Sequence, residues 1–213
     1  DRIVELDAGE VFEHINVGVD VTLIPNTNHE SIRGISLFES NNPILVMQYA
    51  YSQNWDGADC QFDPFMFPVT AVEQYTKNSI FQTPQNIQAN TGFETNSLSI
   101  FAIGDVNDIA KRIEMLSSIT LDGVRIRTID PGFVNNQIPG TNIFWARTHV
   151  TQGAHTLQGN TEFGAYMYGY SNCDSYAWPA AMELKALHVG DSTEVVDTNK
   201  IIITKNRSNT NYN

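Results

Sequence analysis

Residues 163–170 read FGAYMYGY, and the alternation within this stretch predicts a β-strand. Tyr166, Tyr168 and Tyr170 alternate with small or apolar residues. Successive side chains of a β-strand point to opposite faces, so the three tyrosines share one face of a predicted strand. Because the rest of the run is small and apolar, we interpret Tyr166 and Tyr168 as core residues. Tyr170 lies nearer a loop and is a candidate for ligand binding.

Short β-prone runs continue along the chain, separated by Gly, Pro, Asn and Asp. They are residues 3–6, 19–24, 32–37, 44–49, 98–103, 119–121, 124–126, 143–150, 176–184 and 201–204. We interpret the largely apolar run 44–49 as a central strand and residues 52–83 as an irregular, aromatic-rich segment. Asp122-Gly123 predicts a hairpin, because this pair supplies the positive φ angles of a tight turn. Many short strands with almost no helix predict an all-β fold, an antiparallel β-sandwich of the jelly-roll kind.

One segment departs from this pattern. Its apolar residues recur at helical spacing, at Ile109, Ile113 and Leu116. They predict one short helical insertion near residues 108–116, and either Asn107 or Asp108 caps its start.

The chain has 213 residues and a mass of 23.8 kDa, which suits one large all-β domain or two small ones. We predict a β-sandwich binding domain over residues 1–187. Residues 188–213 are more polar and predict C-terminal strands followed by a polar tail or linker.

The charge of the chain excludes one class of partner. Its formal net charge is −12, and its 12 Lys and Arg residues are spread thinly. A nucleic-acid-binding protein needs a basic face to displace counterions, so we exclude nucleic acid. Anionic membrane surfaces are disfavoured for the same reason, and no apolar run approaches the about 18 residues of a membrane span.

The two cysteines, Cys60 and Cys173, lie in polar loops flanked by aromatic residues. Such loops expose thiols, and only an oxidising compartment makes that exposure safe. We therefore favour a Cys60–Cys173 disulfide over two free thiols. The many neutral polar residues are also typical of extracellular β proteins, so both features predict a secreted or cell-surface protein.

Three carboxylates cluster in one loop, at Asp56, Asp59 and Asp63. Oxygen-rich loops hold calcium, but the spacing does not match an EF-hand, and a solvated acidic loop is the favoured interpretation. His149 and His155 flank a turn at Gly153 and lack a third zinc ligand. We predict no cofactor and keep calcium as a weak candidate.

Ligand binding is predicted at loop aromatics and neighbouring polar side chains, since aromatic rings stack on sugar rings or anchor a protein partner. The candidates are Trp55, Asp56, Asp59, Tyr170, Asp174 and Trp178. No GxSxG nucleophile elbow is present, and nothing singles out a pair of glycosidase carboxylates. We therefore predict no catalytic residues and no enzyme.

Four stretches resemble, in order, motifs of one known family. They are NPILVMQY at 42–49, DPFM with VEQY within 63–75, SITLDG at 118–123, and GAHTL, FGAYMYGY and SYAWPAA within 153–181. This pattern is similar to the N-terminal domain family of IgG Fc-binding protein, found in mucus-associated animal proteins and bacterial surface proteins. The chain departs from the pattern at Phe65, at Ala181 and in the helical segment, which looks like an insertion.

The resemblance implies an extracellular, adhesive or scaffold-like role on a β-sandwich core, and it brings no catalytic residues. We predict an adhesion or recognition module that binds glycan or glycoprotein on a cell or matrix surface. The alternative is a structural or assembly module of a surface fibre, which would form a homo-oligomer. A carbohydrate-active enzyme is the least favoured class.

Overall fold

The computed structural model describes residues 2–12, 35–50, 64–84, 93, 95–171, 174–184, 199–202 and 207–212. The chain divides into two compact units, one made of residues 1–45 and 188–213, the other of residues 46–187. The first unit therefore combines the two ends of the sequence. The predicted division into a domain over 1–187 and a segment over 188–213 stays a prediction.

The first unit contains a four-stranded mixed sheet in the order β1-β13-β2-β12. The strands are β1 (Arg2–Leu6), β2 (Leu37–Ser40), β12 (Asn199–Ile202) and β13 (Arg207–Tyr212). The strand β13 pairs in parallel with β1 and with β2, whereas β12 is antiparallel to β2. Residues 207–212 lie in the segment for which the sequence predicts C-terminal strands and a polar tail, and ladders with β1 and β2 occupy their backbone groups.

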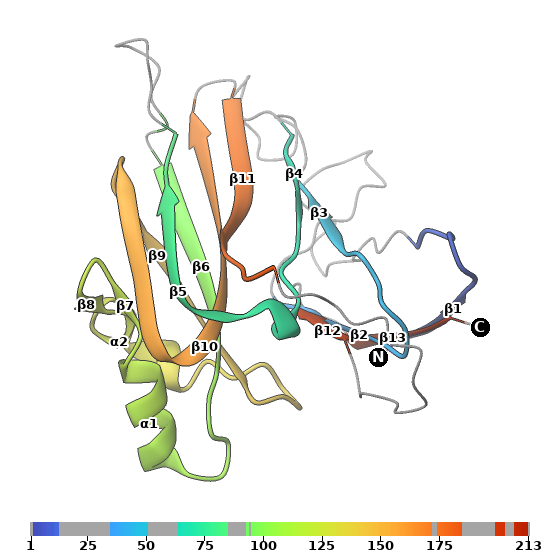
Figure 1. Ribbon diagram of the computed structural model, residues 1–213, viewed down its shortest axis with the longest axis horizontal. Coiled ribbons are helices and arrows are strands. Elements are labelled where there is room, and N and C mark those ends of the chain that lie inside the picture. Colours follow the sequence, from blue (N-terminus) through green and yellow to red (C-terminus); the bar gives the residue numbers. More distant parts are fainter. Residues whose placement is uncertain are drawn as a thin grey trace, which may run out of the picture. The chain divides into compact units, whose positions relative to one another are not determined.

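The second unit is built on a seven-stranded antiparallel sheet with the path β8-β7-β10-β6-β9, to which β5 and β11 are added along β10 (Figure 1). The strands are β5 (Thr76–Gln82), β6 (Thr95–Ile103), β7 (Thr120–Leu121), β8 (Val124–Arg125), β9 (Ile143–His149), β10 (Ala154–Ser171) and β11 (Asp174–Ala181). The strand β10 has 18 residues and pairs with four others. It contains the FGAYMYGY stretch and organises the sheet.

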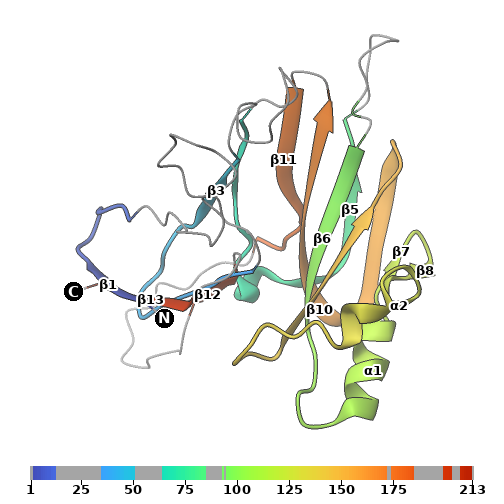
Figure 2. The same cartoon turned by 180° about the vertical axis from the view of Figure 1, so that it is seen from behind.

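Helices cover one face of this sheet. They are α1 (Ile109–Ser117), α2 (Ile126–Ile129) and the 3-10 turn η3 (Pro131–Val134), and Figure 2 shows α1 and α2 beside β7 and β8 at one end of the sheet. Their apolar residues join the main hydrophobic core with the inward side chains of β6, β9 and β10. The Asp108 side chain accepts a hydrogen bond from the Lys111 N–H at 3.0 Å, which confirms the predicted helix and its cap.

The opposite face of the sheet carries a second, smaller β layer. It consists of β3 (Met47–Tyr49) and β4 (Met66–Pro68), which pair with each other. The ring of Phe67 in β4 lies 5.0 Å from the ring of Tyr166 in β10. The predicted all-β class with a short helical insertion is therefore confirmed.

Two local predictions are wrong. Residues 52–83 are not irregular throughout: their described part contains β4, the 3-10 turn η2 (Val72–Gln74) and β5. The strand β5 reads TKNSIFQ, and only Phe81 is buried, so its polar sequence hides the strand. The run 44–49 is not central, because among the described residues its strand β3 pairs with β4 alone.

Candidate functional site

A row of tyrosines lies on the face of the sheet that is turned away from the main core. The alternation of β10 places Tyr166, Tyr168 and Tyr170 on this face and Met167 on the other, where it is fully buried. The ring of Phe65, just before β4, lies 6.4 Å from Tyr168 and 5.9 Å from Tyr170. The predicted shared face of the three tyrosines is thus confirmed.

The neighbouring strands add hydroxyl and cationic groups to this row. On β6, Ser99 lies opposite Tyr166 and Ser97 lies opposite Tyr168. On β9, Arg147 lies opposite Ser99 and His149 lies opposite Ser97. We call these seven residues the tyrosine face: Tyr166, Tyr168, Tyr170, Ser97, Ser99, Arg147 and His149.

The small serines allow a contact between strands that are not adjacent. The strands β9 and β10 are separated by β6, a distance of about 10 Å. Because serine is short, the Arg147 side chain extends over β6, and its Cζ atom lies 5.7 Å from the centre of the Tyr168 ring. A cation over an aromatic face is attracted by the electron-rich ring. The His149 Nδ1 atom also lies 3.5 Å from the Ser97 hydroxyl oxygen.

Exposure differs across the tyrosine face. Tyr166 is buried, and this burial raises the pKa of its hydroxyl above the ordinary value. Tyr168 and Tyr170 are half-buried, whereas Arg147 and His149 are exposed. The outer part of the face therefore offers aromatic surface, hydroxyl groups and a fixed positive charge together.

Two glycines bring aromatic rings against the backbone of β10 and so hold the strand in place. A Cβ atom at Gly164 would lie 2.4 Å from Tyr75 Cε1, and one at Gly169 would lie 2.3 Å from Tyr176 Cε1. Gly169 and Tyr176 are direct partners in the β10–β11 ladder. The Tyr176 hydroxyl donates to Asn96 Oδ1 at 2.5 Å, and burial raises the pKa of this tyrosine.

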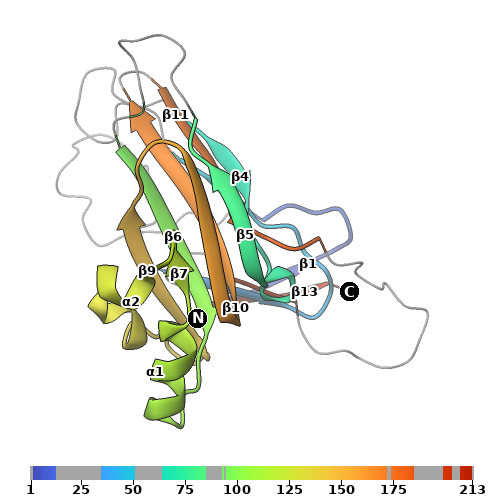
Figure 3. The same cartoon turned by 60° about the vertical axis from the view of Figure 1, so that its left-hand side comes forward.

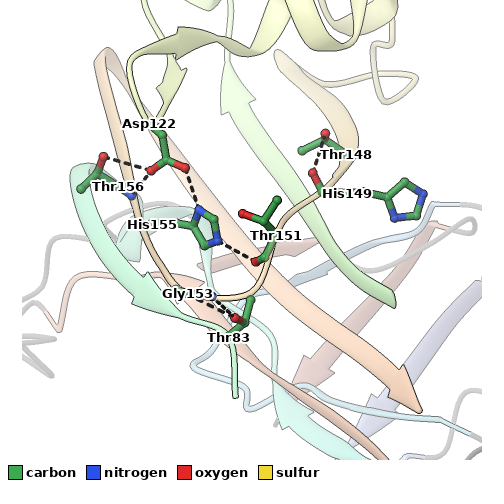
Figure 4. A network of polar contacts seen from close by, with 8 residues as sticks. All are labelled: Thr83, Asp122, Thr148, His149, Thr151, Gly153, His155 and Thr156. Atoms are coloured by element: carbon green, nitrogen blue, oxygen red, sulfur yellow. Dashed lines mark hydrogen bonds and ion pairs between the residues drawn. The ribbon is translucent and has the colours of Figure 1, made fainter. Parts of the chain in front are cut away.

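A second polar cluster pins the Asp-Gly hairpin to the start of β10 (Figure 4). Asp122 and Gly123 have φ angles of 51° and 80°, as the predicted tight turn requires. The Asp122 carboxylate accepts from His155 Nδ1 at 2.6 Å and from the Thr156 N–H at 2.8 Å. The His155 ring is buried and stacks on Phe81 with centroids 5.3 Å apart.

The polar atoms of this cluster are engaged in holding the hairpin. His155 Nε2 lies 2.8 Å from the Thr151 carbonyl oxygen, so both ring nitrogens face acceptors, and neither is available as a general base. Burial works to raise the pKa of Asp122, but the hydrogen bonds from His155 and Thr156 outweigh it and hold that pKa below the usual value. In Figure 4 His149 lies apart from His155, on a different strand.

The structure separates three of the predicted ligand-binding residues. Tyr170 belongs to the tyrosine face. Asp174 is exposed at the start of β11, at the same end of the hairpin as Tyr170, and its Oδ1 atom accepts from the Ser175 N–H. Trp178 lies on the opposite face, packed against the hydrophobic core with its ring 4.4 Å from Tyr176.

The other predicted site residues lie outside the described residues. They are Trp55, Asp56, Asp59 and Asp63 of the acidic loop, and the proposed disulfide partners Cys60 and Cys173. Within the described part of the chain, no three His, Cys, Asp or Glu side chains form a group that would hold a metal ion. Asp105 accepts hydrogen bonds from the Asn107 and Asp108 N–H groups, so it belongs to the start of α1.

Sequence reasoning missed the contribution of β9 to the tyrosine face. The signal was present, because Trp145, Arg147 and His149 alternate with apolar or small residues inside the run 143–150. The position of Arg147 in the sequence does not show that its side chain reaches Tyr168. That contact depends on the register of β9 on β6 and of β6 on β10.

The sequence profile of the IgGFc binding protein family matches residues 2–169. The chain belongs to this family. The matched range includes the Asp122 turn, His155 and all but the last tyrosine of the row, whereas the motif at 175–181 lies beyond it. No curated protein and no solved structure matches the chain. The IgGFc binding protein family is a family of binding domains and not of enzymes, and it is typically extracellular.

Across the described residues, no helix is long and apolar enough to cross a membrane.

Proposed function

We propose that this chain is an extracellular recognition module that binds a glycoprotein through the tyrosine face and performs no chemistry on it. The observation that carries the proposal is the position of Arg147 over Tyr168, beside Tyr170 and Ser97. Tyrosine and arginine are enriched at the centres of protein interfaces, and aromatic rings also stack on sugar rings. The family is named for binding IgG Fc, which is itself a glycoprotein, and this supports a partner of that class.

The absence of chemistry is part of the proposal. The residues that most resemble a catalytic pair, Asp122 and His155, use their polar atoms to hold the hairpin. A base needs a free nitrogen within reach of a substrate proton. The binding-domain character of the family points in the same direction.

The test is the affinity of the full chain for immobilised glycoproteins, IgG Fc among them, before and after enzymatic removal of their glycans. Tyr168→Ala and Arg147→Ala should each weaken capture about 30-fold, the size of an interface hot spot. Tyr49→Ala and Arg127→Ala are matched controls, because both residues are exposed and lie outside the tyrosine face. Far-ultraviolet circular dichroism checks that each variant is folded.

The outcomes separate the possibilities. Capture that is lost after deglycosylation assigns the contact to the glycan, and capture that survives assigns it to the protein surface of the glycoprotein. Equal losses in the control variants, or no capture of any glycoprotein by the folded chain, would contradict the proposal.

A further inference from the structure

Among the described residues, backbone partners occupy the outer edge of β9 along only half of its length. The Trp145 N–H donates to the Asn136 carbonyl oxygen at 3.0 Å, and the Ile138 N–H donates to the Ile143 carbonyl oxygen at 2.9 Å. Gln137 forms an antiparallel bridge with Phe144. Residues 136–138 of the same chain therefore already pair with the first half of this edge, as an added strand would.

Beyond Trp145 no described strand pairs with this edge, and the His149 carbonyl oxygen accepts a hydrogen bond from the Thr148 hydroxyl at 3.2 Å. In an antiparallel strand the N–H and C=O groups of alternate residues point to the same side, so those of Arg147 and His149 point outward like those of Trp145. The inward side is paired, as the 3.0 Å bond from the Val150 N–H to the Asn96 carbonyl oxygen indicates. Among the described residues, the outward N–H and C=O of Arg147 have no backbone partner. Figure 3 shows β9 at the margin of the sheet.

The other margins of this sheet are less suited to pairing. The strand β11 carries Pro179, which lacks an N–H, and β8 has only two residues. The strand β5 carries the exposed Lys77, a residue typical of protected edges. The strand β9 contains no proline, so its open half is the best template for an added strand.

Charge identifies the occupant. No described side chain forms an ion pair with Arg147, which is exposed at the centre of the open half. A second copy of β9 paired edge to edge would bring Arg147 close to the Arg147 or His149 of that copy, and like charges facing each other across a ladder are destabilising. The Arg147 guanidinium lies over the Tyr168 ring, and it gains an opposite-charge pair with a carboxylate at this position when the exposed side chain turns toward the added strand.

The geometry points to the open half of β9, around Arg147, as a site for an extended segment of a partner polypeptide, which adds as an antiparallel strand with a carboxylate opposite Arg147. The Arg147 N–H and C=O exchange both of their hydrogen bonds with the residue opposite, and main-chain bonds of this kind give the affinity in β-strand addition. This inference deepens the proposed function, because the added strand would border the tyrosine face.

The test uses the full chain and short capped peptides of alternating Thr and Val with one central residue, either Glu or Lys. Fluorescence anisotropy should show that the Glu peptide binds about tenfold more tightly than the Lys peptide. Arg147→Glu should reverse this preference, while the matched variant Arg127→Glu leaves it unchanged. N-methylation of the Glu peptide along the edge that faces β9 should abolish binding, and N-methylation along its other edge should not.

Hydrogen exchange supplies a readout at the edge itself, since the Arg147 amide should become protected when the Glu peptide is added. Equal binding of the two charged peptides, or no binding at millimolar concentration, would overturn the inference. The inference would also be overturned if the Arg147 amide were protected in the absence of peptide and lost this protection on dilution. That result would mean that the chain self-associates through this edge.

Failure here is distinguishable from failure of the proposed function. Tyr170→Ala removes a ring from the tyrosine face without touching β9. This variant should bind the Glu peptide as the wild type does while it captures glycoprotein more weakly. Loss of peptide binding in Tyr170→Ala would overturn the assignment to the β9 edge.

Discussion

Replacing Gly169 by alanine tests how β10 is held in the sheet. A Cβ atom at this position would lie 2.3 Å from Tyr176 Cε1, 2.8 Å from Tyr176 Cζ and 2.9 Å from Asn96 Oδ1. Carbon atoms that are not bonded to each other prefer separations of about 3.5–4.0 Å. The alanine therefore forces the Tyr176 ring to move by about 1 Å or more.

The surroundings of the ring set the cost of this movement. Tyr176 is buried, Phe93 meets its ring edge-on at 4.7 Å, and the Trp178 ring lies 4.4 Å away. Overpacking in such a site costs about 1–3 kcal/mol, and loss of the bond to Asn96 adds about 1 kcal/mol. The lower backbone entropy of alanine in the unfolded chain offsets about 0.5–1 kcal/mol. The net loss of unfolding free energy should be about 2 kcal/mol.

The assay is urea unfolding followed by circular dichroism, with the change in midpoint converted through the slope of the transition. Tyr176→Phe is the matched control for the hydroxyl and should cost about 1 kcal/mol. Tyr176→Ala removes the ring that the new methyl group meets. Gly169→Ala should therefore cost little when it is added to Tyr176→Ala, and the difference measures the coupling between the two positions.

Two results would refute this reasoning. One is a Gly169→Ala variant as stable as the wild type. The other is a loss of about 2 kcal/mol that persists when Tyr176 is alanine, since the cost would then arise in the backbone and not at the ring.

Three further predictions concern other parts of the chain. The lowered pKa of Asp122 stabilises the fold above about pH 4, and this contribution is lost as the pH falls through the folded-state pKa. Asp122→Asn should therefore reduce the loss of unfolding free energy on acidification, by about 0.5 kcal/mol or less because the side chain is 45% exposed. Urea unfolding above and below this pKa measures the difference. Asp108→Ala removes the cap of α1 and should cost about 1 kcal/mol in urea unfolding, whereas Glu114→Ala within the same helix should cost less than about 0.5 kcal/mol. The predicted Cys60–Cys173 disulfide requires that the denatured, unreduced chain shows no reactive thiol in a thiol titration, and one thiol or two would contradict it.

The sequence predicted correctly those elements that are stabilised by contacts between residues a few positions apart. The Asp122-Gly123 turn and the cap at Asp108 depend on contacts within a few positions, so the sequence is sufficient to place them. The strand β5 depends instead on its pairing with β10, and its one buried residue gives no alternation. The helix α2 has four residues, too few for a periodic signal.

The face on which a residue lies was harder to predict. In FGAYMYGY both alternating sets are apolar or aromatic, so the pattern does not show which face meets the main core. The structure turns Met167 toward that core and the tyrosines toward the smaller β layer. The same ambiguity affects Trp178, which looks like a loop aromatic in the sequence and packs on the core side because Tyr176 is registered opposite Gly169.

The position of β10 late in the sequence has a consequence for biosynthesis. Both β5 and β6 take their backbone partners from β10, and β9, the other partner of β6, also follows late in the chain. A ribosome makes the chain in the N-to-C direction, so these two strands emerge with unsatisfied edges and remain so until β9 and β10 have been synthesised. Nascent chains of this kind are exposed to mispairing, and assembly of the whole sheet must wait for one late segment.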